Sequence, residues 1–169
     1  MDESRDAAPD ARRILEVLDR RGVAYLLIGG FAVNAHGYPR LTRDVDILVR
    51  PDERNYARLA QAIGDLDPDW RLPGHRSPLD LDRLQWGFGE FARFSTPYGL
   101  LDAHRDLQGV NTAYEELDQR AITAEVGGIR VKVVGYDDLI GIKRAAGRPQ
   151  DLADIAALED ARRGLRSAH

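Results

Sequence analysis

The sequence contains no cysteine among its 169 residues. Disulfide bonds, thiolate nucleophiles and zinc sites built on cysteine are therefore excluded. A net positive charge is also lacking, since 28 acidic and 24 basic side chains give a formal charge of −4 and a pI near 5.6. A nucleic-acid partner would therefore have to bind a local basic patch, because no global basic surface exists.

Long hydrophobic runs are missing as well. No apolar stretch approaches the roughly 20 residues that span a bilayer. The N-terminal segment MDESRDAAPDARR is polar and has no apolar signal region. We therefore expect a soluble, cytoplasmic protein whose residues 1–9 are disordered. The 43% hydrophobic content is enough for a core, and the length fits one domain over residues 1–169.

Apolar periodicity predicts alternating helices and strands. Helices are expected at residues 9–21, 31–36, 53–63, 112–117, 138–146 and 151–162. Strands are expected at residues 23–28, 44–49, 86–94, 100–104, 121–126 and 129–134. Asp137 is the expected N-cap of the helix at 138–146, residues 136–163 form a helical C-terminal part, and residues 64–80 are mostly loop. This order predicts an α+β fold, a mixed β-sheet with helices packed on it and helices at the C-terminus.

Two carboxylates interrupt the apolar strand expected at residues 44–49, DVDILV. Asp44 and Asp46 are separated by one residue, so a strand places both on one face, roughly 7 Å apart. Burying two acids is costly unless a cation compensates their charge. Mg²⁺ takes carboxylate and phosphate oxygens, and two such ions can clamp a phosphoryl transfer. The alternatives are ion pairs with Arg40 and Arg43, or exposure at a strand end.

A glycine pair, Gly29-Gly30, separates the strand at 23–28 from the helix at 31–36. Glycines at such a junction let the backbone approach an anion, and a helix N-terminus offers free N–H groups to it. A triphosphate suits this arrangement, and a simple turn is the alternative.

A third acid, Asp102, interrupts the apolar strand expected at residues 100–104. If this strand neighbours residues 44–49, three carboxylates converge and their mutual repulsion demands a cation. The acid nearest an incoming hydroxyl could also accept its proton as a general base. An acid at a turn or a sheet edge is the alternative.

Together these segments resemble the nucleotidyltransferase superfamily with the DNA polymerase β-like palm. The first motif is Gly29-Gly30, then thirteen residues, then Asp44-Val45-Asp46-Ile47. The further matching segments are Arg40-x-Thr42-x-Asp44, Arg93-Phe94-x-Thr96-Pro97-x-Gly99 before Leu101-Asp102, Asp138-Leu139-Ile140 with Lys143, and Gly147-Arg148-Pro149-x-Asp151-x-x-Asp154. The resemblance covers roughly residues 23–160. Within the superfamily, the sequence most resembles the minimal bacterial branch, which includes abortive-infection (AbiEii-type) toxins and antibiotic nucleotidyltransferases.

This resemblance implies an enzyme that moves an NMP from an NTP, such as ATP, to a hydroxyl acceptor and releases pyrophosphate. It implies catalytic and metal-binding acids around two Mg²⁺ ions, namely Asp44, Asp46 and Asp102. It implies nucleotide contacts at Gly29, Gly30, Arg43, Lys143 and Arg148. For Lys143, a solvated helix lysine is the alternative.

The acceptor stays open between a small molecule such as an aminoglycoside or lincosamide, a protein side chain, and tRNA. A tRNA acceptor would suit a toxin with an antitoxin partner, and a local basic patch could serve it, made of Arg40, Arg43, Lys143, Arg144 and Arg148. Two other classes compete. One is a non-catalytic module that binds a nucleotide or a partner on the same fold. The other is a structural protein whose acids pair with arginines.

Several residues have no settled role. His36 and His104 flank the expected site and could be bases, ligands or packed side chains, and His75 is a third histidine to weigh. Asp151 could be no more than the cap of the last helix, and Asp154 is equally open. The aromatic residues Trp86, Phe88, Phe91 and Phe94 are expected in the sheet face and core, with base stacking as the alternative.

Overall fold

A computed structural model of the chain describes residues 9–69 and 91–167. The expectations for residues 1–8, 70–80 and 86–90 lie outside these ranges, as do His75, Trp86 and Phe88. Among the helices of the described ranges, none is both long and apolar enough to cross a membrane.

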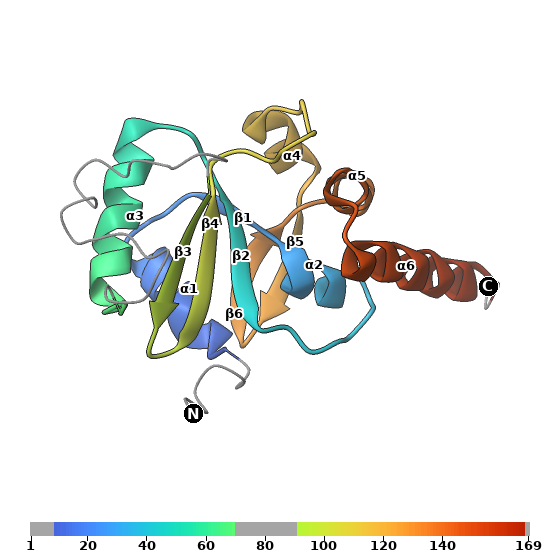
Figure 1. Cartoon of the computed structure of the whole chain (residues 1–169), viewed down its shortest axis with the longest axis horizontal. Coiled ribbons are helices and arrows are strands. Elements are labelled where there is room, and N and C mark those ends of the chain that lie inside the picture. Colours follow the sequence, from blue (N-terminus) through green and yellow to red (C-terminus); the bar gives the residue numbers. More distant parts are fainter. Residues whose placement is uncertain (1–8, 70–90, 168–169) are drawn as a thin grey trace.

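The strands of the described residues form one mixed sheet with the order β3-β4-β2-β1-β6-β5 (Figure 1). They are β1 (Tyr25–Ile28), β2 (Asp44–Val49), β3 (Phe91–Thr96), β4 (Gly99–His104), β5 (Ile122–Val126) and β6 (Ile129–Val133). The pairs β1–β6 and β2–β4 are parallel, and the other neighbours are antiparallel. The expected mixed sheet is confirmed.

Helices cover both faces of this sheet. They are α1 (Ala11–Arg20), α2 (Gly29–Ala35), α3 (Glu53–Asp65), α4 (Tyr114–Arg120), α5 (Tyr136–Ala146) and α6 (Pro149–Ser167). Figure 1 shows α1 behind the sheet and α2 in front of it, with α5 and α6 on the side of α2. The helix α6 packs against α5 and then extends away from the sheet. This confirms the α+β class with a helical C-terminal part.

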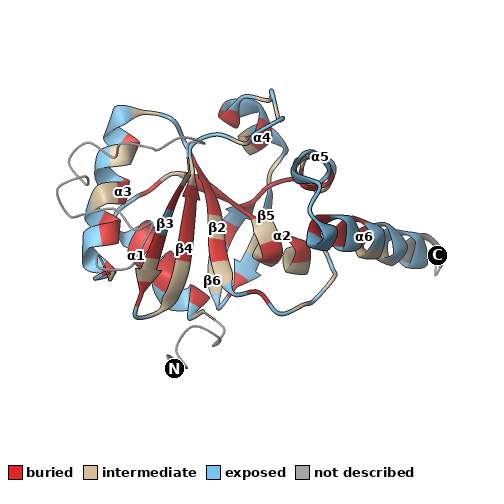
Figure 2. Cartoon of the chain, in the orientation of Figure 1, coloured by how far each residue is buried: buried red, intermediate tan, exposed pale blue. Residues whose placement is uncertain are grey.

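The core is formed by apolar residues of the sheet and of the helices packed on its two faces. On β2, Val45, Ile47 and Val49 are fully buried, while Asp44 and Asp46 on the other face are half-buried. The central strands are buried along most of their length in Figure 2, whereas α6 is largely exposed. The alternation from Asp44 to Ile47 therefore places the two acids on the face of α2, and the next residue on that face, Leu48, is buried.

Two helix starts differ from the expectation. The helix α5 begins at Tyr136 with Gly135 at the N-cap, so the prediction of Asp137 as N-cap is wrong. A Cβ at position 135 would lie 2.7 Å from the Arg120 carbonyl oxygen, so only glycine fits at this N-cap. The helix α6 begins at Pro149, two residues early, because proline is well suited to the first helical position.

The remaining boundaries shift by a few residues. The helix α2 begins at Gly29 itself, so the glycine pair forms the first turn of the helix and does not precede it. The helix α4 starts and ends later than residues 112–117. The strand β3 continues to Thr96 and forms the expected hairpin with β4, in which Thr96 pairs with Gly99.

Candidate active site

Three carboxylates converge on the face of the sheet that carries α2. The strands β2 and β4 are parallel neighbours, and their register places Asp46 directly opposite Asp102. Asp44, Asp46 and Asp102 each offer an oxygen that lies within 4.8 Å of the others, and within the described residues they are the group of three that could hold a metal ion. The two strands are therefore neighbours, as the predicted convergence of the three acids requires.

The electrostatics of this cluster favour a cation. Burial, together with the nearby carboxylates of Asp46 and Asp102, raises the pKa of Asp44 to about 6. Asp102 is only 2% exposed, and burial raises its pKa above the ordinary value, although Arg93 works against this rise. A bound cation would remove the cost of keeping these acids ionised.

Arg93 pairs with the third carboxylate, and the sequence analysis assigned it no role. Its Nε and Nη2 donate to the two oxygens of Asp102 at 2.8 and 2.6 Å, and Nη2 lies 3.6 Å from Asp44 Oδ2. The β3–β4 register sets Arg93 opposite Asp102. A tight hairpin in which Thr96 pairs with Gly99 fixes this register. The turn sequence could therefore have predicted that Arg93 lies opposite Asp102.

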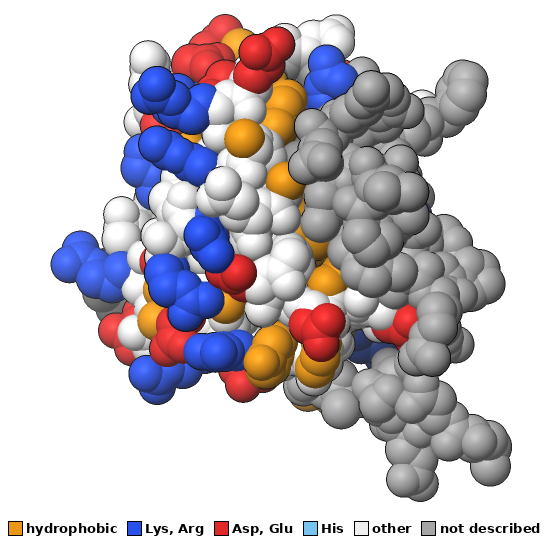
Figure 3. All heavy atoms as spheres, turned by 90° about the vertical axis from the view of Figure 1, so that its left-hand side faces the viewer, with side chains coloured by type: hydrophobic (Ala, Val, Ile, Leu, Met, Phe, Trp, Pro, Cys, Tyr) orange, Lys and Arg blue, Asp and Glu red, His pale blue; other side chains and the backbone are white. Residues whose placement is uncertain are grey.

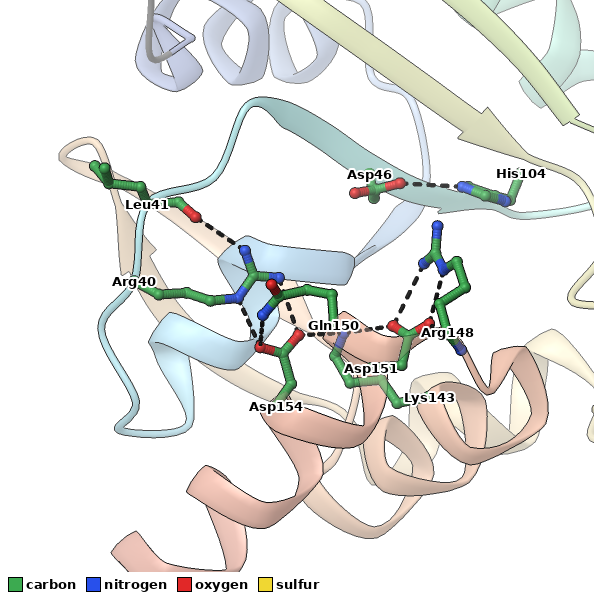
Figure 4. Close-up of polar contacts among 9 residues, drawn as sticks. All are labelled: Arg40, Leu41, Asp46, His104, Lys143, Arg148, Gln150, Asp151 and Asp154. Atoms are coloured by element: carbon green, nitrogen blue, oxygen red, sulfur yellow. Dashed lines mark hydrogen bonds and ion pairs between the residues drawn. The ribbon is translucent and has the colours of Figure 1, made fainter. Parts of the chain in front are cut away.

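Asp46 is held between a glycine and a histidine. Gly29 has a φ of +66°, and a Cβ there would collide with Oδ2 of Asp46 and lie 2.7 Å from its Cγ. The other oxygen of Asp46 is 3.2 Å from His104 Nε2 (Figure 4). Only glycine therefore fits at position 29 with Asp46 in this position.

The second glycine supports the loop that enters β2. A Cβ at Gly30 would lie 2.5 Å from the Thr42 hydroxyl oxygen. This hydroxyl donates to the Asp44 carbonyl at 3.2 Å. The side chain of Asn34 closes the same loop through two hydrogen bonds to the backbone of Arg40. The glycine pair thus lets α2 lie directly against the acidic strand.

A buried ion network lies beneath the site and joins α5 to α6. Lys143 is 4% exposed, and its Nζ lies 3.1 Å from Asp151 and 2.7 Å from Asp154 (Figure 4). Arg40 donates to Asp154 from Nη2 at 3.0 Å, and Arg148 donates to Asp151 from Nε at 2.7 Å. The alternative of a solvated Lys143 is wrong, and Arg40 forms its ion pair with Asp154, although its charge also lowers the pKa of Asp44.

The carboxylates of this network are ionised partners of the lysine. Burial opposes ionisation of Asp151 and Asp154, but their hydrogen bonds outweigh it and hold both pKa values below the ordinary range. Asp151 is the third residue of α6, not its N-cap, although it accepts a hydrogen bond from the Arg148 backbone N–H at 3.3 Å. Direct contact of Lys143 with a phosphate would require exchange of its carboxylate partners.

The other candidate residues divide between the site and the core. The guanidinium of Arg148 points toward the Asp46–His104 pair in Figure 4. Arg43 is exposed and immediately precedes β2. His36 lies outside the cluster, since its Nε2 is 2.8 Å from the Val134 carbonyl oxygen. Phe94 is fully buried, as expected for a core residue.

Comparison with protein-family models and with curated protein sequences found no match. Solved structures do resemble the chain. The lincosamide antibiotic adenylyltransferase LnuA, with lincomycin bound, has a TM-score of 0.62 at 17% identity, over 90% of this chain and 96% of that chain. The antibiotic-resistance factor ANT(2'')-Ia, in solution, has a TM-score of 0.56 at 16% identity, over 94% and 90% of the two chains.

A second structure of ANT(2'')-Ia, in complex with adenylyl-2''-tobramycin, gives a TM-score of 0.56 at 18% identity, over 94% of this chain and 95% of that chain. At such identities the likeness concerns the fold, and it extends over nearly the whole of each chain. The expected fold is thus confirmed: the chain has the nucleotidyltransferase fold.

Proposed function

We propose that the protein is a Mg²⁺-dependent nucleotidyltransferase that moves an NMP from an NTP to a hydroxyl group of a small acceptor. The observation that carries this proposal is the convergence of Asp44, Asp46 and Asp102, whose oxygens lie within 4.8 Å of one another beside the N-terminus of α2. Three acids on one sheet face cost stability in the absence of a cation, so the arrangement suits a cationic ligand better than packing.

These residues fit a divalent cation by the chemistry of their donors, since hard oxygen ligands are what Mg²⁺ prefers. Asp44, Asp46 and Asp102 would hold it. When bound, Mg²⁺ would neutralise charge on the phosphate oxygens of the NTP. Gly29, Gly30, Arg43 and Arg148 are the proposed contacts of the triphosphate. Lys143 belongs to this set only if it exchanges Asp151 or Asp154 for a phosphate oxygen.

The proposed reaction is an in-line displacement. The acceptor oxygen forms a bond to the α-phosphorus, the bond from this phosphorus to the α–β bridging oxygen breaks, and pyrophosphate leaves with the electron pair. The proton of the acceptor hydroxyl goes to a carboxylate oxygen of Asp102. Burial raises the pKa of Asp102, which favours acceptance of a proton, although both of its oxygens accept hydrogen bonds from Arg93 in this structure.

The charge distribution favours a small acceptor over RNA. Of the basic patch expected to contact tRNA, Arg40, Lys143 and Arg148 are engaged by Asp151 and Asp154 within the chain. The face drawn in Figure 3, which is the left-hand side of Figure 1 and lies away from this patch, carries both basic and acidic side chains. The ligands bound in two of the structural neighbours, lincomycin and adenylyl-2''-tobramycin, are also small molecules. A protein or tRNA acceptor, with a toxin role and an antitoxin partner, is the alternative.

A non-catalytic binding module on the same fold is the competing class. It accounts for the glycine pair and the metal-type acids but predicts no transfer. A purely structural role is supported by the ion pairs of Arg93 with Asp102 and Asp44. It does not explain why a further carboxylate, that of Asp46, lies beside them.

Thermal unfolding with nucleotide separates the structural class from the other two. Addition of ATP or GTP with Mg²⁺ should raise the melting temperature, because a ligand that binds only the folded state stabilises it by about 2.7 kcal/mol at 100 times its dissociation constant. The same titration in EDTA should give a smaller shift. No shift with any NTP would contradict both nucleotide-binding classes.

Transfer assays separate the enzyme from the binding module. Wild-type protein, radiolabelled NTPs and pools of aminoglycosides, lincosamides, proteins or tRNA should yield a labelled acceptor and pyrophosphate from one pool. Asp46→Asn should abolish this product and leave the fold intact. Asp118→Asn is the matched control, since Asp118 pairs with Lys132 on the surface, away from the carboxylate cluster. Retained transfer in Asp46→Asn would refute the assigned role of Asp46.

A further inference from the structure

The guanidinium of Arg93 occupies one side of the carboxylate cluster. It engages both oxygens of Asp102, at 2.8 and 2.6 Å, and reaches Asp44 at 3.6 Å. The Asp102 side chain is 3% exposed and that of Arg93 is 44% exposed, so the cation closes the cluster on its solvent side. A bidentate pair of this kind fixes the carboxylate in one orientation.

The charge count of the cluster then changes. The three acids carry three negative charges when ionised, and Arg93 supplies one positive charge within ion-pair distance of two of them. Two negative charges remain, which one divalent cation balances. A second divalent ion would bring a net positive charge into a cluster whose third carboxylate already has a cationic partner.

The three acids differ in how closely their oxygens are engaged by other side chains. Both Asp102 oxygens accept from Arg93. Asp46 makes its contact with the imidazole of His104, which is not a permanent cation. Asp44 Oδ2 lies 3.6 Å from Nη2 of Arg93, which is longer than a hydrogen bond. Asp44 and Asp46 therefore retain the oxygens best able to take a metal.

We infer that Arg93 stands in for one of the two divalent ions expected from the sequence, so that the protein itself holds a single divalent cation on Asp44 and Asp46. This inference depends on the proposed metal-dependent function. In it, Arg93 is a positioning residue for Asp102 and an internal cation of the site. The occupant is a hard divalent ion such as Mg²⁺ or Mn²⁺.

Counting bound Mn²⁺ tests the inference without any nucleotide or acceptor. Electron paramagnetic resonance reports free Mn²⁺ during a titration of the full chain, and the difference gives the number bound. Wild-type protein should bind one ion. Arg93→Gln should bind two, because both Asp102 oxygens become available and the internal charge is lost. Arg93→Lys keeps the charge and should bind one.

A matched control is available on the other side of the molecule. Arg120 makes a bidentate pair with Asp138 at 2.9 and 2.8 Å, with the same chemistry as the Arg93–Asp102 pair. Arg120→Gln should leave the count at one. Two ions in the wild type, an unchanged count in Arg93→Gln, or two ions in Arg93→Lys would each overturn the inference.

A second measurement covers the case in which Arg93→Gln folds only with metal. The melting temperature should rise more steeply with the logarithm of Mn²⁺ concentration in Arg93→Gln than in the wild type, because more ions are released on unfolding. Equal slopes would overturn the inference. Its failure is distinguishable from failure of the proposed function: two ions in the wild type refute only the inference, whereas no bound ion in any variant refutes both.

Discussion

Asp46 of β2 and Asp102 of β4 are directly paired residues of parallel neighbouring strands. This pairing places the carboxylate of Asp102 beside those of Asp44 and Asp46, so that the three acids form one cluster. Parallel strands require a crossover connection, so the two acids are necessarily distant in sequence. The candidate site therefore exists only through a long-range contact.

Replacement of Gly29 by alanine should reduce both stability and activity. The left-handed φ of +66° costs a non-glycine residue roughly 1–2 kcal/mol, and the added Cβ would displace the Asp46 carboxylate. We expect a loss of at least about 1–2 kcal/mol in urea unfolding and a strong loss of Mn²⁺ binding. Gly64→Ala is the control: Gly64 lies in α3 with open space around its Cα, so alanine there should stabilise by about 0.5–1 kcal/mol. Equal effects of the two changes would refute the close packing of Gly29 against Asp46.

Removal of the buried lysine should destabilise the protein severely. Lys143→Ala leaves Asp151 and Asp154 buried without their shared ammonium group, and loss of one partner from a buried ion pair costs about 3–5 kcal/mol. Chemical denaturation of the variant measures this loss. Lys132→Ala serves for comparison, since the exposed pair of Lys132 with Asp118 is worth about 0–1 kcal/mol. A Lys143 variant as stable as the Lys132 variant would contradict the buried network.

The elevated pKa of Asp44 predicts a pH dependence in the absence of metal. The folded-state pKa is about 6 against 3.8 for an unperturbed aspartate, so the protonated form is favoured by folding. The contribution of Asp44 to stability is therefore complete below pH 3.8 and is lost as the pH rises through 6. Asp44→Asn removes this titration. The stability of the variant relative to the wild type should increase between pH 4 and pH 6 and then level off, as measured by urea midpoints. Parallel profiles would show that Asp44 is not perturbed.

Chelation of divalent cations should stop transfer without unfolding the protein. The apolar core contains none of the three acids, and Arg93 neutralises part of the acidic cluster without metal. EDTA should therefore abolish NMP transfer, excess Mg²⁺ should restore it, and circular dichroism should report the same secondary structure throughout. Cooperative unfolding on addition of EDTA would indicate that the metal is structural.

Local patterns predicted much of the molecule. The strand at residues 44–49, its acidic and apolar faces, and the hairpin before Asp102 were all predictable, because side-chain alternation and turn residues act over a few positions. Helix ends were less accurate. The start of α5 at Gly135 depended on the close packing of this residue against Arg120, which outweighed the capping tendency of Asp137. The start of α6 at Pro149 reflects the preference of proline for the first helical turn.

The carboxylate cluster and the basic side chains near it depend partly on local sequence and partly on tertiary structure. The sequence by itself determined that Asp44 and Asp46 share a face beside a glycine pair, because strand geometry permits no other placement. Only the tertiary structure decided that Asp102 joins them, that Arg93 pairs with Asp102, and that Lys143 lies buried against Asp151 and Asp154. The physical reason is that the strand order and the α5–α6 junction are set by the packing of the whole core, and no local pattern of residues specifies that packing.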